Sequence, residues 1–285
     1  MAIIPKIEYE TKLQERLSAP TTWKEVCLVK MTNTGIWRNP YLTDATVGTG
    51  TRGTGYTPYA VATTDDTVSI TDYVYSAPVI DDADLAQKTF SDWMEVADNV
   101  GVMLNEKMET AMLAEHAQWT NFDNASIGGG AGNITVATTN IKKIITGLKR
   151  EIREAGGGEM LSRNGGFVIW READYELVEQ LASAEGFQTA DTVLTNGISQ
   201  VNGGFKWMGM YHYSSSKHAS GHVFAGVRKA FAVGICKATY GKVKTLINPV
   251  VSGAQISGIG LESRIDSKFK AWTKMAPILF DVLVA

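Results

Sequence analysis

The stretch DLAQKTFSDWMEVADNVGVMLNEKMETAMLAEHAQW, residues 84–119, carries the strongest periodic signal in the chain. Its apolar residues recur at helical spacing as far as Trp119, so they would form one apolar face of a helix. Asp81 and Asp82 stand just before it, where acidic residues favour a helix N-terminus. A helix of about 36 residues would be roughly 54 Å long. We therefore predict a long strut helix whose core face holds Phe90, Trp93, Ala97, Val100, Leu104 and Met108.

The segment before the strut is predicted to be a long β-hairpin. Two runs rich in strand-forming residues lie between Tyr56 and Ile80, on either side of Thr64-Asp65-Asp66, which we take as the turn. A hairpin is marginally stable in water unless it packs on another surface. This hairpin would therefore lie either on its own domain or on a neighbouring subunit.

Residues 1–46 show no sustained period of 2 or 3.6, apart from a short helix predicted around residues 11–17. This pattern favours an extended arm. An arm that carries Trp23 and Trp37 must cover them against another surface. We expect a neighbouring subunit to supply that surface.

A glycine-rich junction, Ile127–Asn133, separates the strut from a second lobe of mixed helices and strands. The patterns predict helices over residues 139–155 and 172–184, a buried strand over 167–170 and a single strand over 205–213. From Gly221 to the end the chain is mostly strand-like. We expect these last strands to form one sheet that includes the C-terminus.

Composition excludes several classes of protein. The chain has 285 residues, is 44% hydrophobic and carries a net charge of −3, so it is globular and lacks the basic excess of a non-specific nucleic-acid binder. Cys27 and Cys236 have no metal-site spacing, which predicts free thiols. The N-terminus resembles no signal peptide. The apolar run 277–280 is far shorter than the ~20 residues of a membrane span.

Motifs for chemistry are weak. Gly48, Gly50 and Gly53 match the dinucleotide-loop spacing, but Tyr56-Thr-Pro and β-branched residues follow where that motif requires a helix. His212, His218 and His222 surround three serines and suggest an alternative hypothesis, a metal site or a small-molecule enzyme, although a polar loop is the commoner explanation. His116 is interpreted as a solvated helix residue. We therefore predict no enzyme activity and no catalytic, cofactor or metal site.

Charge is unevenly distributed along the chain. Residues 65–123 hold thirteen acidic side chains against Lys88 and Lys107, whereas residues 192–261 hold seven basic side chains and no acid. The two segments either neutralise each other within one subunit or steer association between subunits. The sequence leaves both alternatives open.

The order of these parts resembles that of the Hong Kong 97-like major capsid proteins of tailed phages. The stretches that carry the resemblance are residues 68–75 running into 79–87, and residues 194–199 through 204–208 to 225–231. The resemblance implies an α+β capsid fold with an N-terminal arm (1–46), an extended loop (47–80), a peripheral domain with a spine helix (81–125), an axial domain (126–235) and closing peripheral strands (236–285).

This resemblance also implies a function and partners. The chain would self-assemble as pentamers and hexamers into an icosahedral shell in the virion, built in the host cytoplasm around DNA that it contacts without sequence specificity. A separate scaffolding protein and a portal are expected, while decoration proteins stay open. An encapsulin-like shell that holds a cargo enzyme is the alternative. The candidate intersubunit contacts are Trp23, Trp37, Arg38, Arg52, Tyr56, Tyr59, Tyr73 and Tyr75.

Overall fold

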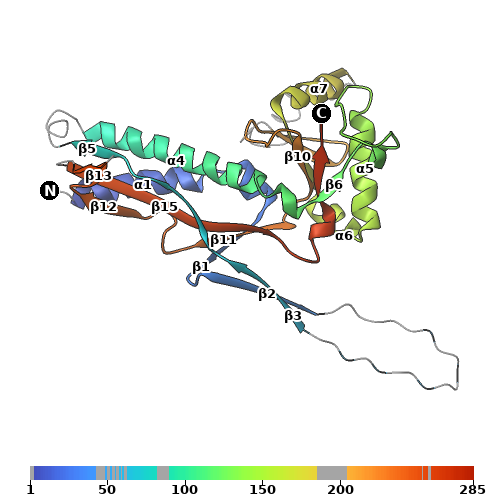
Figure 1. Cartoon of the computed structure of the whole chain (residues 1–285), viewed down its shortest axis with the longest axis horizontal. Helices are drawn as coiled ribbons and strands as arrows, with labels where there is room; N and C mark the ends of the chain where they lie inside the picture. Colours follow the sequence, from blue (N-terminus) through green and yellow to red (C-terminus); the bar gives the residue numbers. More distant parts are fainter. Residues whose placement is uncertain are drawn as a thin grey trace.

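The computed structural model has two joined lobes and a projecting hairpin (Figure 1). One lobe is elongated and holds the N-terminal helix, whereas the other is compact and holds the C-terminus. Among the described residues, none of the helices combines the length and apolar character that a membrane crossing requires. The residues that the structure describes are 3–42, 49, 52, 55, 58, 60, 63–81, 90–184, 204–251, 253–255 and 258–285.

The elongated lobe is built on a six-stranded sheet around one long strand, β15 (Gly258–Ala271). From Leu261 to Ala271 this strand alternates between buried and more exposed residues, as a sheet with one covered face requires. Strand β1 runs parallel to β11, and all other pairings in this sheet are antiparallel. The partners are β11 (Phe231–Cys236) and β12 (Val243–Ile247) on one edge of β15, β4 (Asp72–Ser76) and β5 (Val79–Asp81) on the other, and β1 (Leu28–Thr32) beyond β11.

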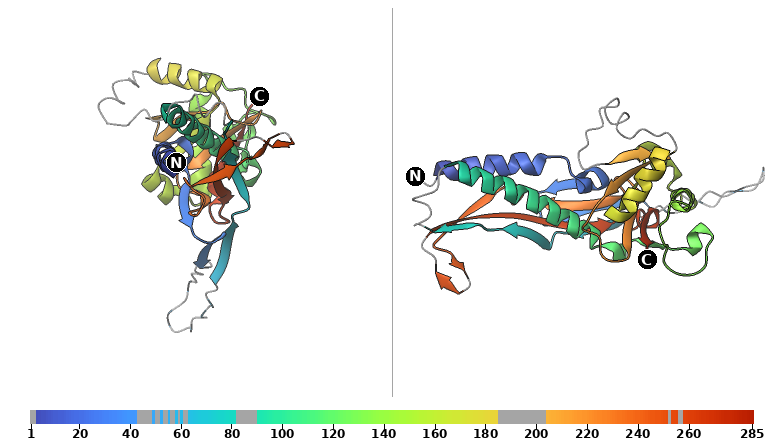
Figure 2. Two further views of the ribbon diagram at one scale, coloured as in Figure 1. Left: turned by 90° about the vertical axis from the view of Figure 1, so that its left-hand side faces the viewer. Right: turned by 90° about the horizontal axis from the view of Figure 1, so that it is seen from above.

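Two helices, α1 (Ile3–Ser18) and α4 (Phe90–Leu113), lie side by side along the covered face of this sheet (Figure 2). They approach closely at Gly101, where an added Cβ would lie 2.6 Å from the Cβ of Arg16. Arg16 also donates from its Nη2 to Asp98 Oδ2 over 2.8 Å. The short helix α2 (Thr22–Val26) follows α1 and contacts α4. Gly101 is therefore required in the middle of the strut for close helix packing.

The compact lobe surrounds a second six-stranded sheet, in the order β6, β16, β10, β7, β9, β8. Every residue of its inner strand β7 is buried. Helix α5 buries an isoleucine-rich face and contacts the neighbouring strand β10. The bounds in this lobe are β6 (Thr120–Phe122), α5 (Ile141–Glu154), α6 (Gly158–Asn164), β7 (Gly166–Trp170), α7 (Glu172–Ala184), β8 (Phe205–Trp207), β9 (Met210–Ser214), β10 (His222–Val227) and β16 (Leu279–Leu283). The remaining elements are η1 (His116–Gln118), η2 (Ala125–Ile127), β13 (Val250–Val251), β14 (Ala254–Gln255) and η3 (Ala276–Ile278).

Trp119 joins the two lobes. Its ring stacks on Phe224 of β10, with centroids 3.6 Å apart, and meets Phe231 of β11 edge-on at 5.8 Å. These two strands belong to different sheets. The prediction that the apolar stripe extends to Trp119 on one helix is wrong, because α4 ends at Leu113 and a 3₁₀ turn redirects the chain toward the core.

The strut is shorter than predicted. Helix α4 has 24 residues, which corresponds to a length of about 36 Å. Residues 82–89, the expected start of the strut, lie outside the described residues. Ala97, Val100, Leu104 and Met108 are buried in the core, whereas the side chains of Phe90 and Trp93 are not among those described.

The prediction of an extended arm is wrong for residues 3–18. Residues 3–18 form α1, in which Tyr9, Leu13 and Leu17 recur four residues apart and are fully buried in the core with residues of α4. The predicted short helix was therefore part of a longer one. Trp23 is also buried in its own chain, so no surface of it is left for a neighbouring subunit.

The hairpin is also composed differently. Its strands are β2 (Ile36–Leu42), which lies within the predicted arm, and β3 (Thr63–Ser69). The predicted turn, Thr64–Asp66, lies within β3, while β4 pairs with β15 instead. The glycines at 48, 50 and 53 lie outside the described residues. Local pattern could not reveal these pairings, because strand partners are distant in sequence.

Strands in the last third also differ from the prediction. Residues 205–213 are two strands joined at Met208 and Gly209, whose positive φ values of 49° and 75° are typical of a tight hairpin turn. The closing strands do not form one sheet, since β11, β12 and β15 join the first sheet and β10 and β16 the second. Helix α7, predicted over residues 172–184, is confirmed.

Candidate functional site

The hairpin β2–β3 projects away from both lobes (Figure 1) and is held at its base by a small apolar cluster. Trp37 of β2 meets Trp272 edge-on, with centroids 4.8 Å apart. Val68 of β3 is buried with Ala232 and Trp272. The base of the hairpin therefore packs on its own chain, while its outer part extends beyond the body.

A buried carboxylate fixes the same base. Asp66 of β3 accepts hydrogen bonds from Lys270 Nζ at 2.5 Å and from the backbone N–H of Thr273 at 2.7 Å. The hydroxyl of Thr273 donates to the same carboxylate at 3.0 Å. Asp66, which the sequence places in a predicted turn, thus fixes the base of the hairpin to Lys270 and Thr273. Hydrogen bonds to a charged carboxylate are stronger than those between neutral groups.

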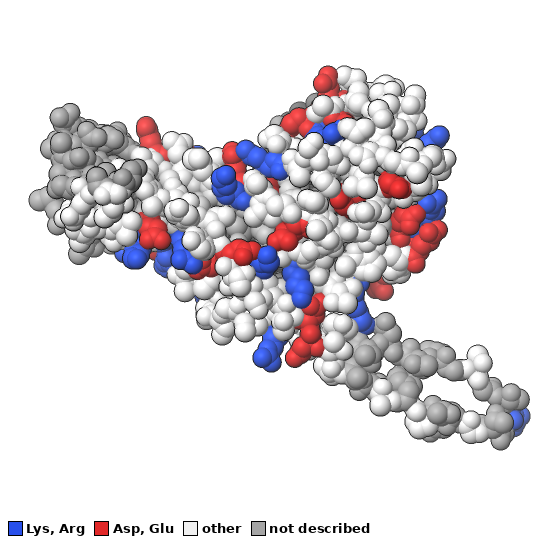
Figure 3. All heavy atoms as spheres, viewed as in Figure 1, with Lys and Arg blue, Asp and Glu red and all other residues white. Residues whose placement is uncertain are grey.

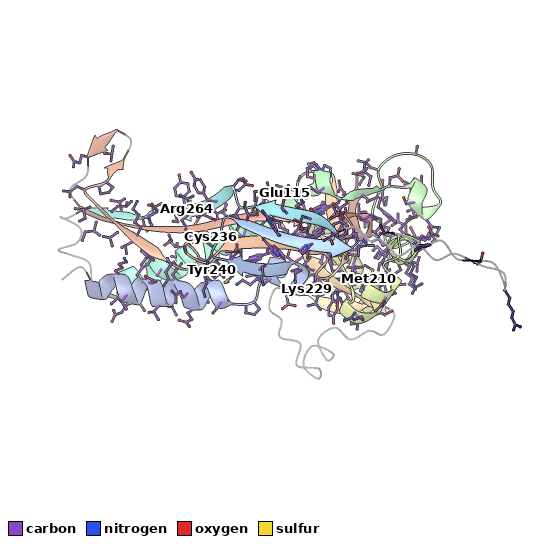
Figure 4. All side chains as sticks on the ribbon, turned by 90° about the horizontal axis from the view of Figure 1, so that it is seen from below. Glu115, Met210, Lys229, Cys236, Tyr240 and Arg264 are labelled. Carbon is purple, nitrogen blue, oxygen red and sulfur yellow. The ribbon has the colours of Figure 1, made fainter. Side chains whose placement is uncertain are left out.

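The face of the first sheet that the helices leave open presents aromatic and charged side chains. Tyr73 and Tyr75 of β4 are 52% and 63% exposed. Arg264 of β15 lies over the Tyr73 ring, 4.0 Å from its centroid. Arg264 is labelled in Figure 4. Tyr and Arg are enriched at protein–protein interfaces. This open face is one of two candidate contact surfaces, the other being the hairpin.

The structure describes only some of the other candidate contact residues. Arg38 of β2 and Arg52 are exposed, and Trp37 is half-buried against Trp272. Tyr56 and Tyr59 lie outside the described residues. The structure therefore brings Tyr73 and Tyr75 together, with ring centroids 5.8 Å apart, and places Trp37 and Arg38 on the hairpin.

The acidic segment is partly neutralised within the subunit. Glu106 of α4 pairs with Lys217 at 2.9 Å, which joins the acidic and basic segments. Asp72 and Glu115 instead share Lys268, at 2.8 and 3.0 Å. Acidic and basic side chains alternate along the elongated lobe (Figure 3). Intrasubunit pairing therefore occurs, although most partners of the acids come from outside the basic segment.

His212 is a structural residue of the compact lobe. It is fully buried, and its Nδ1 accepts a hydrogen bond from Trp170 Nε1 at 3.0 Å. Its Nε2 lies 3.1 Å from the carbonyl oxygen of Trp207. The neutral tautomer with a proton on Nε2 satisfies both contacts. Burial lowers the pKa of His212 to about 4, because a charged ring would lose its hydration.

This environment predicts a stability that depends on pH. Between pH 6.5 and 4 the unfolded chain binds a proton on His212 and the folded chain does not, so stability is full above pH 6.5 and falls as the pH decreases. We expect a contribution of about 2–3 kcal/mol to be lost by pH 4.5. Urea unfolding at pH 7 and 4.5 measures it. His212→Gln, which does not titrate, should lose correspondingly less, and an equal loss in both proteins would contradict the assignment.

The predicted histidine cluster does not form as a single site. His222 lies instead beside His116 and Asp281, and its Nδ1 is 2.7 Å from Asp281 Oδ2. His116 is not a solvated helix residue, since its ring stacks on His222 at 3.9 Å. Burial raises the pKa of Asp281, whereas the hydrogen bond with His222 acts to lower it. Sequence reasoning missed this grouping because the three residues come from η1, β10 and β16, and only the fold brings them together.

No protein-family model matches the chain, and no curated protein matches its sequence. Solved structures match its fold. A structure of Mycobacterium phage Che8 aligns over 94% of this chain and 90% of its own, with a TM-score of 0.59 and 11% identity. The capsid of Ralstonia phage GP4 aligns over 91% and 87%, with a TM-score of 0.59 and 9% identity. The virus-like particle from Pyrococcus furiosus aligns over 97% and 98%, with a TM-score of 0.56 and 9% identity.

These likenesses establish the fold. Both lobes take part, because the matched regions span nearly the whole chain. The α+β Hong Kong 97-like capsid fold predicted from the sequence is confirmed.

Proposed function

We propose that this chain is a structural subunit that self-assembles into the icosahedral head shell of a tailed phage, around double-stranded DNA. The observation that carries the proposal is the match of nearly the whole chain to phage capsid structures. The aligned regions leave no large part of the chain in which a separate activity would reside. The proposed role is therefore structural, and the chain would act in the virion after assembly in the host cytoplasm.

The shape of the subunit supports self-assembly. The hairpin extends beyond the lobes that hold its base (Figure 1), and a two-stranded hairpin is marginally stable alone in water. A neighbouring subunit would supply the missing support. Contacts of this kind would link each subunit to others in pentamers and hexamers.

We assign the domains by analogy with the capsid fold. The elongated lobe corresponds to the peripheral domain, the compact lobe to the axial domain, and the hairpin with residues 43–62 to the extended loop. The boundaries proposed from the sequence shift accordingly. Strand β11 moves from the axial to the peripheral part, and β16 moves to the axial part, because strand pairing decides membership of a sheet.

We assign the intersubunit contacts to the open sheet face and the hairpin. Tyr73, Tyr75 and Arg264 form the first surface. Arg38 lies on the second, and the exposed Arg52 lies in the segment between its two strands. A net charge of −3 would leave DNA without strong general attraction to the shell. A scaffolding protein and a portal are the further partners that we propose.

The proposal is tested by expressing the full chain alone. Its mass is measured by size-exclusion chromatography with light scattering, and heavy fractions are imaged by negative-stain electron microscopy. Pentamers, hexamers or closed particles are the expected result. A monodisperse monomer that persists at high concentration and with crowding agents would contradict self-assembly of this chain.

The contents of particles isolated from their natural source separate a phage head from a cargo compartment. Nuclease-protected double-stranded DNA is the expected content. A single enclosed enzyme, identified by mass spectrometry in particles free of DNA, would favour the encapsulin-like alternative.

A further inference from the structure

Three side chains that can bind a metal ion meet where the two lobes join. His116 belongs to η1, just after the strut helix, while His222 and Asp281 lie on the adjacent strands β10 and β16. One nitrogen from each histidine and one oxygen from the carboxylate all lie within 4.8 Å of one another. The grouping is compact although its members are far apart in the sequence.

The carboxylate of Asp281 lacks the partners that a buried charge requires. Its side chain is 3% exposed, and its Oδ1 has no hydrogen-bond partner among the described residues. Its Oδ2 faces His222 Nδ1 at 2.7 Å and His116 Nδ1 at 3.9 Å. Buried carboxylates are normally paired, hydrogen-bonded or bound to metal, so one oxygen of Asp281 is left to be satisfied.

The two histidines complete a ligand set. Their rings stack with centroids 3.9 Å apart and planes inclined by 24°. Their side chains are 32% and 27% exposed, so the group is closed on the Asp281 side and open to solvent on the other. Two imidazoles and one carboxylate, with an open position for water, are a common ligand set for Zn²⁺.

We propose that His116, His222 and Asp281 bind a divalent transition-metal ion, with Zn²⁺ as the best-suited ion. In tetrahedral coordination, bonds to zinc of about 2.0–2.2 Å place the ligand atoms about 3.3–3.6 Å apart. The 2.7 Å contact between His222 and Asp281 would therefore lengthen, and the wider separations in the group would shorten. Rotation of the two partly exposed imidazoles would make both adjustments. The ion would replace the contact between Asp281 and His222 and would neutralise the buried carboxylate.

The site would also stiffen the joint between the lobes. His116 follows the strut of the elongated lobe, whereas His222 and Asp281 belong to the sheet of the compact lobe. A metal bonded to all three would link the two directly and would stabilise the folded chain by mass action. This inference concerns the subunit alone and does not rest on the proposed shell function.

Zinc binding to the full chain tests the proposal. Protein purified without a histidine tag is stripped with a chelator, dialysed and titrated with Zn²⁺ in a calorimeter. We expect one ion per subunit and a higher melting temperature with Zn²⁺. His116→Ala should weaken binding at least about tenfold, since even the loss of residues that only support ligands has such an effect.

Glu115→Gln is the matched control. It removes a carboxylate next to His116 but none of the three ligands, and it should bind Zn²⁺ like the natural protein. Asp281→Asn is the second test, with folding checked by circular dichroism. Absence of stoichiometric binding, or unchanged binding in folded His116→Ala protein, would overturn the proposal. Equal weakening by Glu115→Gln would overturn the assignment of the ligands.

Discussion

Replacing Trp119 with alanine is expected to lower the free energy of unfolding of the subunit by about 3–5 kcal/mol, the usual cost of removing a large buried aromatic side chain. Trp119 is 6% exposed, stacks on Phe224 and meets Phe231 edge-on. The substitution would leave a cavity between two sheets that pack through this ring. Urea unfolding of the unassembled subunit, followed by circular dichroism, measures the effect.

Trp119→Phe is the matched control. The indole Nε1 has no hydrogen-bond partner in the described part of the chain, so phenylalanine loses ring volume but no polar contact. It should therefore lose clearly less stability than alanine. A loss within about 0.5 kcal/mol for Trp119→Ala, as at a surface position, would show that the ring does not join the lobes.

Introducing a charge at Tyr75 is expected to prevent shell assembly while the subunit still folds. Tyr75 is 63% exposed on the open face of the first sheet and pairs in register with Arg264. In Tyr75→Glu, burial of the new carboxylate against a neighbouring subunit would be unfavourable. A loss of only 1.4 kcal/mol in one contact weakens that contact tenfold, and a shell repeats the contact many times. We therefore expect particle yield to fall at least about tenfold.

Particle yield is measured by sedimentation and electron microscopy, and subunit stability by urea unfolding. Tyr75→Phe keeps the ring and should assemble. Because Tyr75 is exposed, Tyr75→Glu should change subunit stability by no more than about 0.5 kcal/mol. Normal particles from the glutamate variant would exclude Tyr75 from the intersubunit contacts, without bearing on the fold.

Several elements were predictable because their signals are local. Helix α7 has the predicted bounds, and α5 lies within the predicted segment. The apolar stripe of the strut placed Ala97, Leu104 and Met108 on its buried face. In each case one face packs on a core, so the period of the sequence reports the geometry directly.

One long strand lies within the segment predicted to be mostly strand-like but has no predicted bounds, although its signal is also local. In β15 the apolar or small residues Leu261, Ile265 and Phe269 alternate with charged ones such as Arg264 and Lys268. The structure shows that these charges lie on the less covered face, where Lys268 pairs with Asp72 and Glu115.

The sequence by itself determined the long helix, the two-lobed division and the order of parts that resembles a capsid fold, because amphipathic periods and turn residues act over a few neighbouring positions. Only the tertiary structure decided that β2 pairs with β3, that β11 and β16 belong to different sheets, and that His116 meets His222 and Asp281. These contacts join residues far apart in the chain. Their partners are selected by packing and hydrogen bonding across the whole fold, which no local pattern encodes.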